Sequence, residues 1–166
     1  MVVSSAMAEI SDLSLPLRAF LKTYRWRTID PVPVARLSKP LSECRTALVS
    51  SAGFVVPGDT PFSNSVRGGD YSFRIIPVDA DVQSLEEHHR SDSFSHAGVE
   101  ADRNMGLPLD RLHEMAADGI IGDVAPRHIS LMGSITAPGR LVKRTLPEVA
   151  DIMVEDQVDI GLMVPV

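Results

Sequence analysis

The chain has 166 residues, of which 44% are hydrophobic and 23% are charged, and its formal net charge is −6. This length fits one domain with its own hydrophobic core. The negative charge disfavours nucleic acid and membrane surfaces as partners. Cys44 is the single cysteine, which excludes a disulfide framework and a Cys-rich metal site within the chain. No apolar stretch has the length that a bilayer requires, and a lone cysteine without a signal peptide favours a cytoplasmic location.

The first 40 residues are predicted to form a helix and a connector. Between residues 10 and 26 the apolar side chains recur at helical spacing: Leu13, Leu17, Phe20, Leu21 and Tyr24. Residues 29–40 contain three prolines and cannot form regular structure. We therefore divide the chain into an amino-terminal region, residues 1–40, and an α/β domain, residues 41–166.

Strands alternate with helices in the second region. Short apolar runs predict strands at residues 45–51, 72–77, 129–135 and 158–166, and apolar residues three or four apart predict helices at residues 108–121 and 141–155. Pro147 moves the expected start of the second helix toward Thr145. This alternation predicts an α/β fold of three layers, in which a mostly parallel, Rossmann-like sheet of about four strands carries flanking helices.

The carboxyl ends of the first and third strands are candidate substrate sites, because ligands of open α/β sheets bind at that edge. Ser51 and Gly53 follow the first strand, and Gly133 and Ser134 end the third. Glycine at such a position lets a ligand approach the backbone, although Gly133 is also consistent with a simple strand end. Neither segment has the pattern of a phosphate loop. Cys44 precedes the first strand, which places it at the wrong edge for catalysis and favours a structural thiol.

A histidine-rich segment supplies further candidates. His88, His89 and His96 are followed by Asp102 and Asn104, a combination that suits a metal site or an acid/base pair. A solvated polar loop explains the same residues, and no compact metal motif is present. The acidic neighbours are expected to raise the pKa of these histidines.

Arg127 and His128 form a third candidate site directly before the third strand. Arginine pairs with carboxylates through two parallel hydrogen bonds, so this pair suits a substrate that carries a carboxylate. The alternative is an ordinary helix-to-strand loop with His128 on the surface.

Several segments together resemble a known family. They are residues 47–53, 69–74, 102–104, 107–112, 119–122, 125–128 and 132–133, and the block from Asp102 to Gly133 is the specific part. This pattern resembles the selenoprotein B family of glycine, sarcosine, betaine and D-proline reductases over residues 40–166. The resemblance implies reductive cleavage of a carbon–nitrogen bond in an amino acid or an N-methylated derivative.

The resemblance also implies a redox centre and partners. In the family a selenocysteine or cysteine follows the strand that corresponds to residues 160–166, and a dithiol re-reduces it; this sequence ends at Val166. A coding sequence that continues in frame past a TGA codon would account for that end. We expect a small amino-acid-like substrate, no metal, and a homo-oligomer or a partner reductase subunit, since an apolar end strand is prone to pair with another chain.

The residue roles under this interpretation are as follows. His96 and Asp102 are the expected acid/base groups, Asn104 orients the substrate, Arg127 anchors its carboxylate and His128 donates a proton. Two alternatives remain open: a non-catalytic binding or assembly module of the same fold, and a metal-assisted lyase or hydrolase that uses His88, His89, His96 and Asp102.

Overall fold

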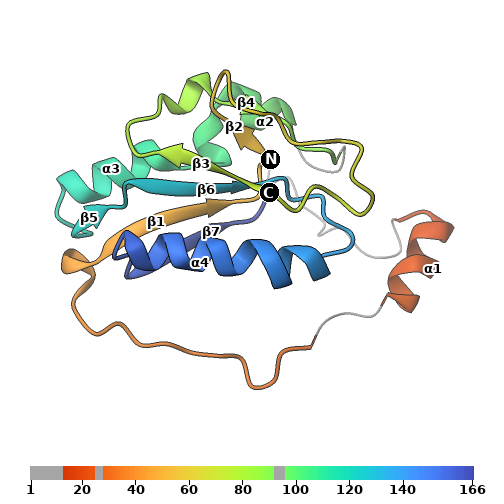
Figure 1. Ribbon diagram of the computed structural model, residues 1–166, viewed down its shortest axis with the longest axis horizontal. Coiled ribbons are helices and arrows are strands. Elements are labelled where there is room, and N and C mark those ends of the chain that lie inside the picture. Colours follow the sequence, from red (N-terminus) through yellow and green to blue (C-terminus); the bar gives the residue numbers. More distant parts are fainter. Residues whose placement is uncertain (1–12, 25–27, 92–95) are drawn as a thin grey trace, which may run out of the picture. The chain divides into compact units, whose positions relative to one another are not determined.

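The computed structural model describes residues 13–24, 28–91 and 96–166 (Figure 1). The chain forms two compact units, Met1–Arg36 and Leu37–Val166. The first contains helix α1 (Leu15–Thr23), which lies inside the helix predicted at residues 10–26, and the ends of that prediction fall outside the described residues. No residue of α1 is buried, and its apolar side chains Leu15 and Phe20 are exposed.

The second unit contains the sheet and the remaining helices. Its strands are β1 (Arg45–Ser50), β2 (Phe54–Val55), β3 (Phe73–Pro77), β4 (Glu86–Glu87), β5 (Asp123–Val124), β6 (Arg127–Leu131) and β7 (Ile160–Val164). Its helices are α2 (His96–Ala101), α3 (Leu109–Ala117) and α4 (Leu146–Glu155), and a π-helical turn, Leu141–Thr145, leads into α4. Within the described ranges, no helix has the length and apolar character that crossing a bilayer requires.

The central sheet has the order β3–β6–β1–β7 (Figure 1). Strands β6 and β7 both pair in parallel with Val49 and Ser50 of β1, so they lie on opposite sides of it. Short strand β5 pairs with the first two residues of β1 and extends β6. Strand β3 is antiparallel to β6. The sheet is therefore mostly parallel, and β1, β6 and β7 present their carboxyl ends at one edge.

Both faces of the sheet are covered at β1 and β6, which confirms the predicted α/β fold, whereas β7 is largely exposed. One face holds the larger core, in which Leu48 and Ile76 of the sheet pack with Leu109 and Leu112 of α3. On the other face, Val49 and Ile129 pack against Val149 of α4. Burial on both faces explains why β1 reads as a continuous apolar run rather than an alternating one.

Element boundaries differ from the predictions at two functionally relevant places. The strand predicted at residues 129–135 is β6, which begins at Arg127 and ends at Leu131. The helix predicted at residues 108–121 is α3, which ends at Ala117. The chain turns at Gly119, whose φ of 69° is a conformation that suits glycine at a helix end.

Candidate active site

Four predicted substrate-site residues gather at the carboxyl edge of the sheet. Ser51 follows β1, and its amide donates to the carbonyl of Val164 in β7 (3.0 Å). The hydroxyl of Ser51 also accepts the amide of Val166 (2.9 Å). The amide of Gly53 donates to Leu131 at the end of β6 (2.9 Å). The ends of the three parallel strands are thus tied together at one edge.

Gly133 brings a histidine into this edge. Its φ is 78°, and a side-chain carbon there would meet the carbonyl oxygen of Ser51 and would lie 2.6 Å from Nε2 of His89. Gly53 also lies close to this histidine: a Cβ atom added at Gly53 would lie 2.9 Å from the backbone nitrogen of His89. The two glycines therefore allow His89 to approach the strand ends. Ser134, the next residue, lies against the loop at Gly69.

A network of hydrogen bonds fixes His89 and His96. The amide of Ser91 donates to Nδ1 of His89 (3.1 Å), so the neutral imidazole carries its proton on Nε2, the atom beside Gly133. Nδ1 of His96 lies 2.9 Å from Glu87, and its Nε2 lies 2.8 Å from the carbonyl of Ser91. Glu87 also accepts the amide of His89 (3.2 Å). Glu87 thus links the two histidines, whose ring centroids are 6.4 Å apart.

The sequence predicts a raised pKa for these histidines, and this prediction is wrong for His89. Burial lowers its pKa below the ordinary value of 6.5, and the nearby Glu87 only partly offsets this effect. The acidic neighbours do not determine the pKa of His89, because the desolvation of the imidazolium lowers this pKa more than Glu87 raises it. His89 is therefore mostly neutral at pH 7.

Asp102 and Asn104 have structural partners. Asp102 accepts hydrogen bonds from the Asn104 amide (2.9 Å) and from the side chain of Gln83 (2.9 Å), and these bonds lower its pKa. The side chain of Asn104 donates to Asp110 in the first turn of α3 (2.8 Å) and accepts its amide (3.2 Å). The two residues therefore join the turn at residues 103–105 to α3. Their expected acid/base and orienting roles remain untested.

Arg127 and His128 lie at the opposite edge, because both belong to the amino end of β6. The guanidinium of Arg127 pairs with Asp156 (2.7 Å) and Glu155 (3.0 Å). These carboxylates, Asp156 first, raise the pKa of Arg127. His128 is fully buried, and its Nδ1 accepts the amide of Leu48 (3.0 Å). The structure does not bring this pair to His96 and Gly133, and its geometry favours structural roles over the predicted anchor and proton donor.

The Arg127 pairing yields a stability prediction. Asp156 is 9% exposed, whereas the side chain of Glu155 is 66% exposed. We expect Asp156→Asn to lower the midpoint of thermal unfolding by about 4 °C, because the guanidinium then loses its most buried partner. The matched variant Glu155→Gln should lower the midpoint by no more than about 1 °C, since exposed ion pairs contribute little. Differential scanning calorimetry measures both, and equal shifts would contradict the assignment.

The alternative of a metal-assisted enzyme finds no support among the described residues. Within residues 13–24, 28–91 and 96–166, no group of three His, Cys, Asp or Glu side chains is placed to hold a metal ion. His88 lies near Glu86 (3.5 Å), whereas Asp102 is held by Gln83 and Asn104. In the described part of the chain, only His89 and His96 of this set share a partner, Glu87.

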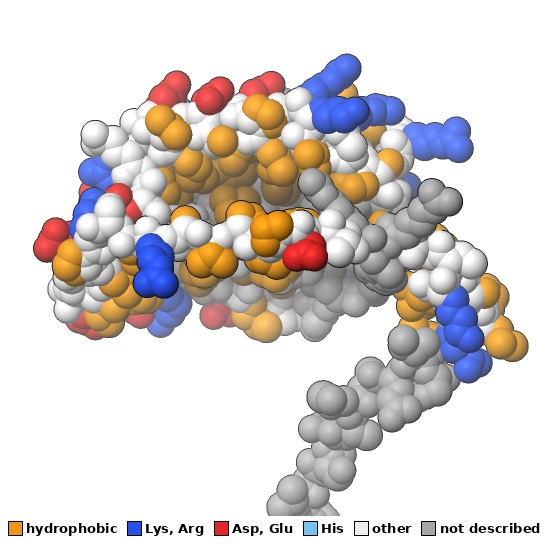
Figure 2. Space-filling view, turned by 90° about the horizontal axis from the view of Figure 1, so that it is seen from below, with side chains coloured by type: hydrophobic (Ala, Val, Ile, Leu, Met, Phe, Trp, Pro, Cys, Tyr) orange, Lys and Arg blue, Asp and Glu red, His pale blue; other side chains and the backbone are white. Residues whose placement is uncertain are grey.

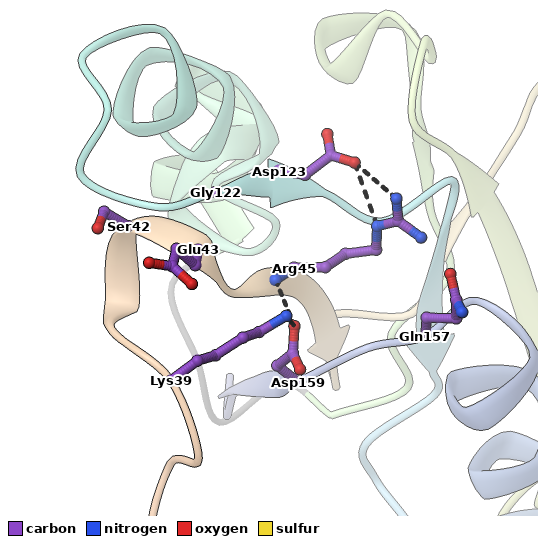
Figure 3. Close-up of a pocket in the computed structure, with 8 residues that line it drawn as sticks. All are labelled: Lys39, Ser42, Glu43, Arg45, Gly122, Asp123, Gln157 and Asp159. Atoms are coloured by element: carbon purple, nitrogen blue, oxygen red, sulfur yellow. Dashed lines mark hydrogen bonds and ion pairs between the residues drawn. The ribbon is translucent and has the colours of Figure 1, made fainter.

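A polar hollow of about 620 Å³ lies at the amino ends of β1, β5 and β7 (Figure 3). Lys39 pairs there with Asp159 (2.7 Å), which also accepts the amide of Arg45 (2.8 Å). The Arg45 side chain pairs with Asp123 (2.9 Å). This hollow could not be predicted from the sequence, because its residues come from segments that are far apart in the chain. Its two ion pairs tie the strand ends together, on the side away from His89.

Comparisons with known proteins bear on these observations. The family model described as "Glycine/sarcosine/betaine reductase selenoprotein B" matches residues 14–165. The D-proline reductase subunit gamma of Acetoanaerobium sticklandii is 33% identical over 136 residues, which are 81% of this chain and 54% of that protein. The glycine reductase complex component B subunit gamma of Carboxydothermus hydrogenoformans is 30% identical over 146 residues, 86% of this chain and 31% of that protein.

A third relative is the sarcosine reductase complex component B subunit beta of Peptoclostridium acidaminophilum, 28% identical over 130 residues, which are 72% of this chain and 28% of that protein. The chain thus spans between about a quarter and about half the length of these relatives. No solved structure matches it.

Proposed function

The chain belongs to the glycine/sarcosine/betaine reductase selenoprotein B family, and from this membership we propose that it is the substrate-binding part of an amino-acid reductase. Its substrate is a small amino acid or N-methylated derivative, and its reaction is the reductive cleavage of a carbon–nitrogen bond. The observation that carries this proposal is the convergence of Ser51, Gly133 and His89 at the carboxyl edge of the sheet. This edge is where open α/β sheets bind ligands.

The reaction needs a redox atom that these residues cannot supply. Cys44 is fully buried, and its thiol faces the carbonyl of Pro40 at the amino end of β1 (3.2 Å). A thiolate or selenolate from a partner subunit or from a longer form of the polypeptide therefore acts at the carboxyl edge. It attacks the substrate carbon as the carbon–nitrogen bond breaks, and the amine leaves with a proton. One thiol of an external dithiol then attacks the sulfur or selenium, the bond to carbon breaks and the carbon takes up a proton. The second thiol closes the disulfide and releases the thiolate or selenolate.

The residues of this chain bind the substrate and handle the proton. We assign proton donation to the leaving nitrogen to Nε2–H of His89, which is buried beside Gly133 and reaches a substrate only when the strand ends move. Glu87 and His96 position it through the bonds described above.

Ligand binding tests the proposal on the 166-residue chain. Isothermal titration calorimetry with glycine, sarcosine, betaine and D-proline is expected to detect binding of at least one of them. His89→Gln should weaken that binding by at least about tenfold, because the variant loses one hydrogen bond to the ligand. The matched control is His113→Gln at an exposed position of α3, and this variant should bind as the unchanged chain does.

Two results would contradict the proposal. One is the absence of binding for all four compounds, and the other is equal binding by the His89→Gln and unchanged chains. A dithiol-dependent assay of the longest in-frame polypeptide then tests turnover, which is expected there and not in the 166-residue chain.

A further inference from the structure

An apolar groove of about 630 Å³ runs along one side of α4. Figure 2 shows hydrophobic side chains gathered in a hollow on this face of the molecule. The floor of the groove contains Val49 of β1, Leu131 of β6 and Met163 of edge strand β7. Its wall is α4. Exposed apolar patches of this kind mark surfaces that bind another protein segment.

The apolar surface of α4 is wider than its own sheet requires. Val149 and Met153 pack against the sheet. Both also line the groove, together with a second stripe, Leu146, Ala150 and Val154, of which Val154 is 77% exposed. Residues four apart form the ridge by which helices most often pack on one another. The small side chain of Ala150 at the centre of this ridge allows close approach of a second helix.

Charge is distributed unevenly along the same helix. Residues 138–145 carry Arg140, Lys143 and Arg144 and no acidic residue, whereas residues 146–156 carry four acidic residues and no basic one. Two of the four, Glu155 and Asp156, pair with Arg127 of the same chain, which leaves Glu148 and Asp151 for a partner. In Figure 2, acidic side chains line one rim of the hollow and basic side chains gather at one end of it. Two copies of this helix that run antiparallel would be complementary in charge, because the basic end of each would lie beside the acidic end of the other.

We propose that a second copy of this chain occupies the groove, with the two α4 helices antiparallel about a two-fold axis near Ala150. Each α4 then fills the groove of the other copy, and Leu146 of one copy meets Val154 of the second copy. Such an isologous contact uses one surface twice and closes as a dimer. The charge gradient favours a second copy as the occupant of the groove, because a helix of uniform charge would not be complementary to it.

The test uses the full 166-residue chain and compares the same substitution at two exposed alanines. Ala150 and Ala117 are both exposed alanines in helices, the first in the groove and the second at the end of α3. Sedimentation equilibrium should give the unchanged chain a mass of twice 18.0 kDa. Ala150→Arg should weaken the dimer at least about tenfold through steric and charge conflict at the axis, and Ala117→Arg should leave it intact.

Cross-linking locates the axis independently of stability. Ala150→Cys should form a dimer-sized disulfide under mild oxidation, because two cysteines at a close helix crossing satisfy the geometry of the bond; Ala117→Cys should not. Cys44 is fully buried, so the introduced thiol is the exposed one. A mass of 18.0 kDa for the unchanged chain overturns the proposal and leaves the groove to a different polypeptide. Equal cross-linking at both positions overturns it as well.

Discussion

Replacing Gly133 with alanine is expected to lower the free energy of unfolding by about 3 kcal/mol, the sum of backbone strain and a steric conflict. The residue has φ of 78°, which side chains other than glycine rarely adopt. Its new methyl group would meet the Ser51 carbonyl and would lie 2.6 Å from Nε2 of His89. Either the strand ends or the imidazole must move. Urea denaturation measures the change, and ligand titration of the same variant should show weakened binding.

Gly119→Ala is the matched control. Gly119 has φ of 69°, but no atom lies within 4 Å of its Cβ position. Its replacement therefore isolates the cost of the left-handed backbone, about 1 kcal/mol. The difference between the two variants, about 2 kcal/mol, measures the close approach at Gly133. Similar costs at both positions would show that His89 does not press on the strand end.

The regular part of the fold could be predicted because it is encoded locally. Strand β1 is a buried apolar run, and α3 shows apolar residues at helical spacing with glycine after its end. Strands β2 and β4 could not be predicted in the same way. Each has two residues and pairs with the other across more than 30 positions, so no local pattern marks them.

The candidate site was predicted in part, and the misplaced residues share a cause. The sequence pattern places His128 in a loop, because the predicted strand begins at Ile129. The strand begins at Arg127 instead, and both of its faces are covered, so His128 is buried in the sheet. The partner that holds Arg127, Asp156, is 29 positions away. Pairing between distant segments leaves no signal in a single sequence.

Gly133 and His89 show the opposite case. A glycine at a strand end was expected to let a ligand approach the backbone. The group that approaches is His89 of the same chain, and the ligand site is inferred beside it. The sequence predicted the need for close approach at this point, while the identity of the approaching group depends on the course of residues 79–106, where no periodicity is visible.

Acidification between pH 6.5 and 4 is expected to remove about 3 kcal/mol of stability through His128. Burial, with a smaller effect from nearby His113, lowers the pKa of His128 from 6.5 to about 4 in the folded chain. In this interval the unfolded chain binds a proton that the folded chain excludes. Stability is therefore complete above the unfolded pKa and declines as the pH falls toward 4. The lowered pKa of His89 acts in the same direction.

The variant His128→Asn separates this effect from the others. Its amide oxygen can accept the Leu48 amide as Nδ1 of His128 does, but it does not titrate. We expect lower stability at pH 7 from the lost volume, and a decline between pH 6.5 and 4 that is smaller by about 3 kcal/mol. His88→Asn, which leaves the surroundings of His128 unchanged, should retain the full decline. Urea unfolding across this pH range measures all three chains, and an undiminished decline in His128→Asn would assign the pH dependence to other groups.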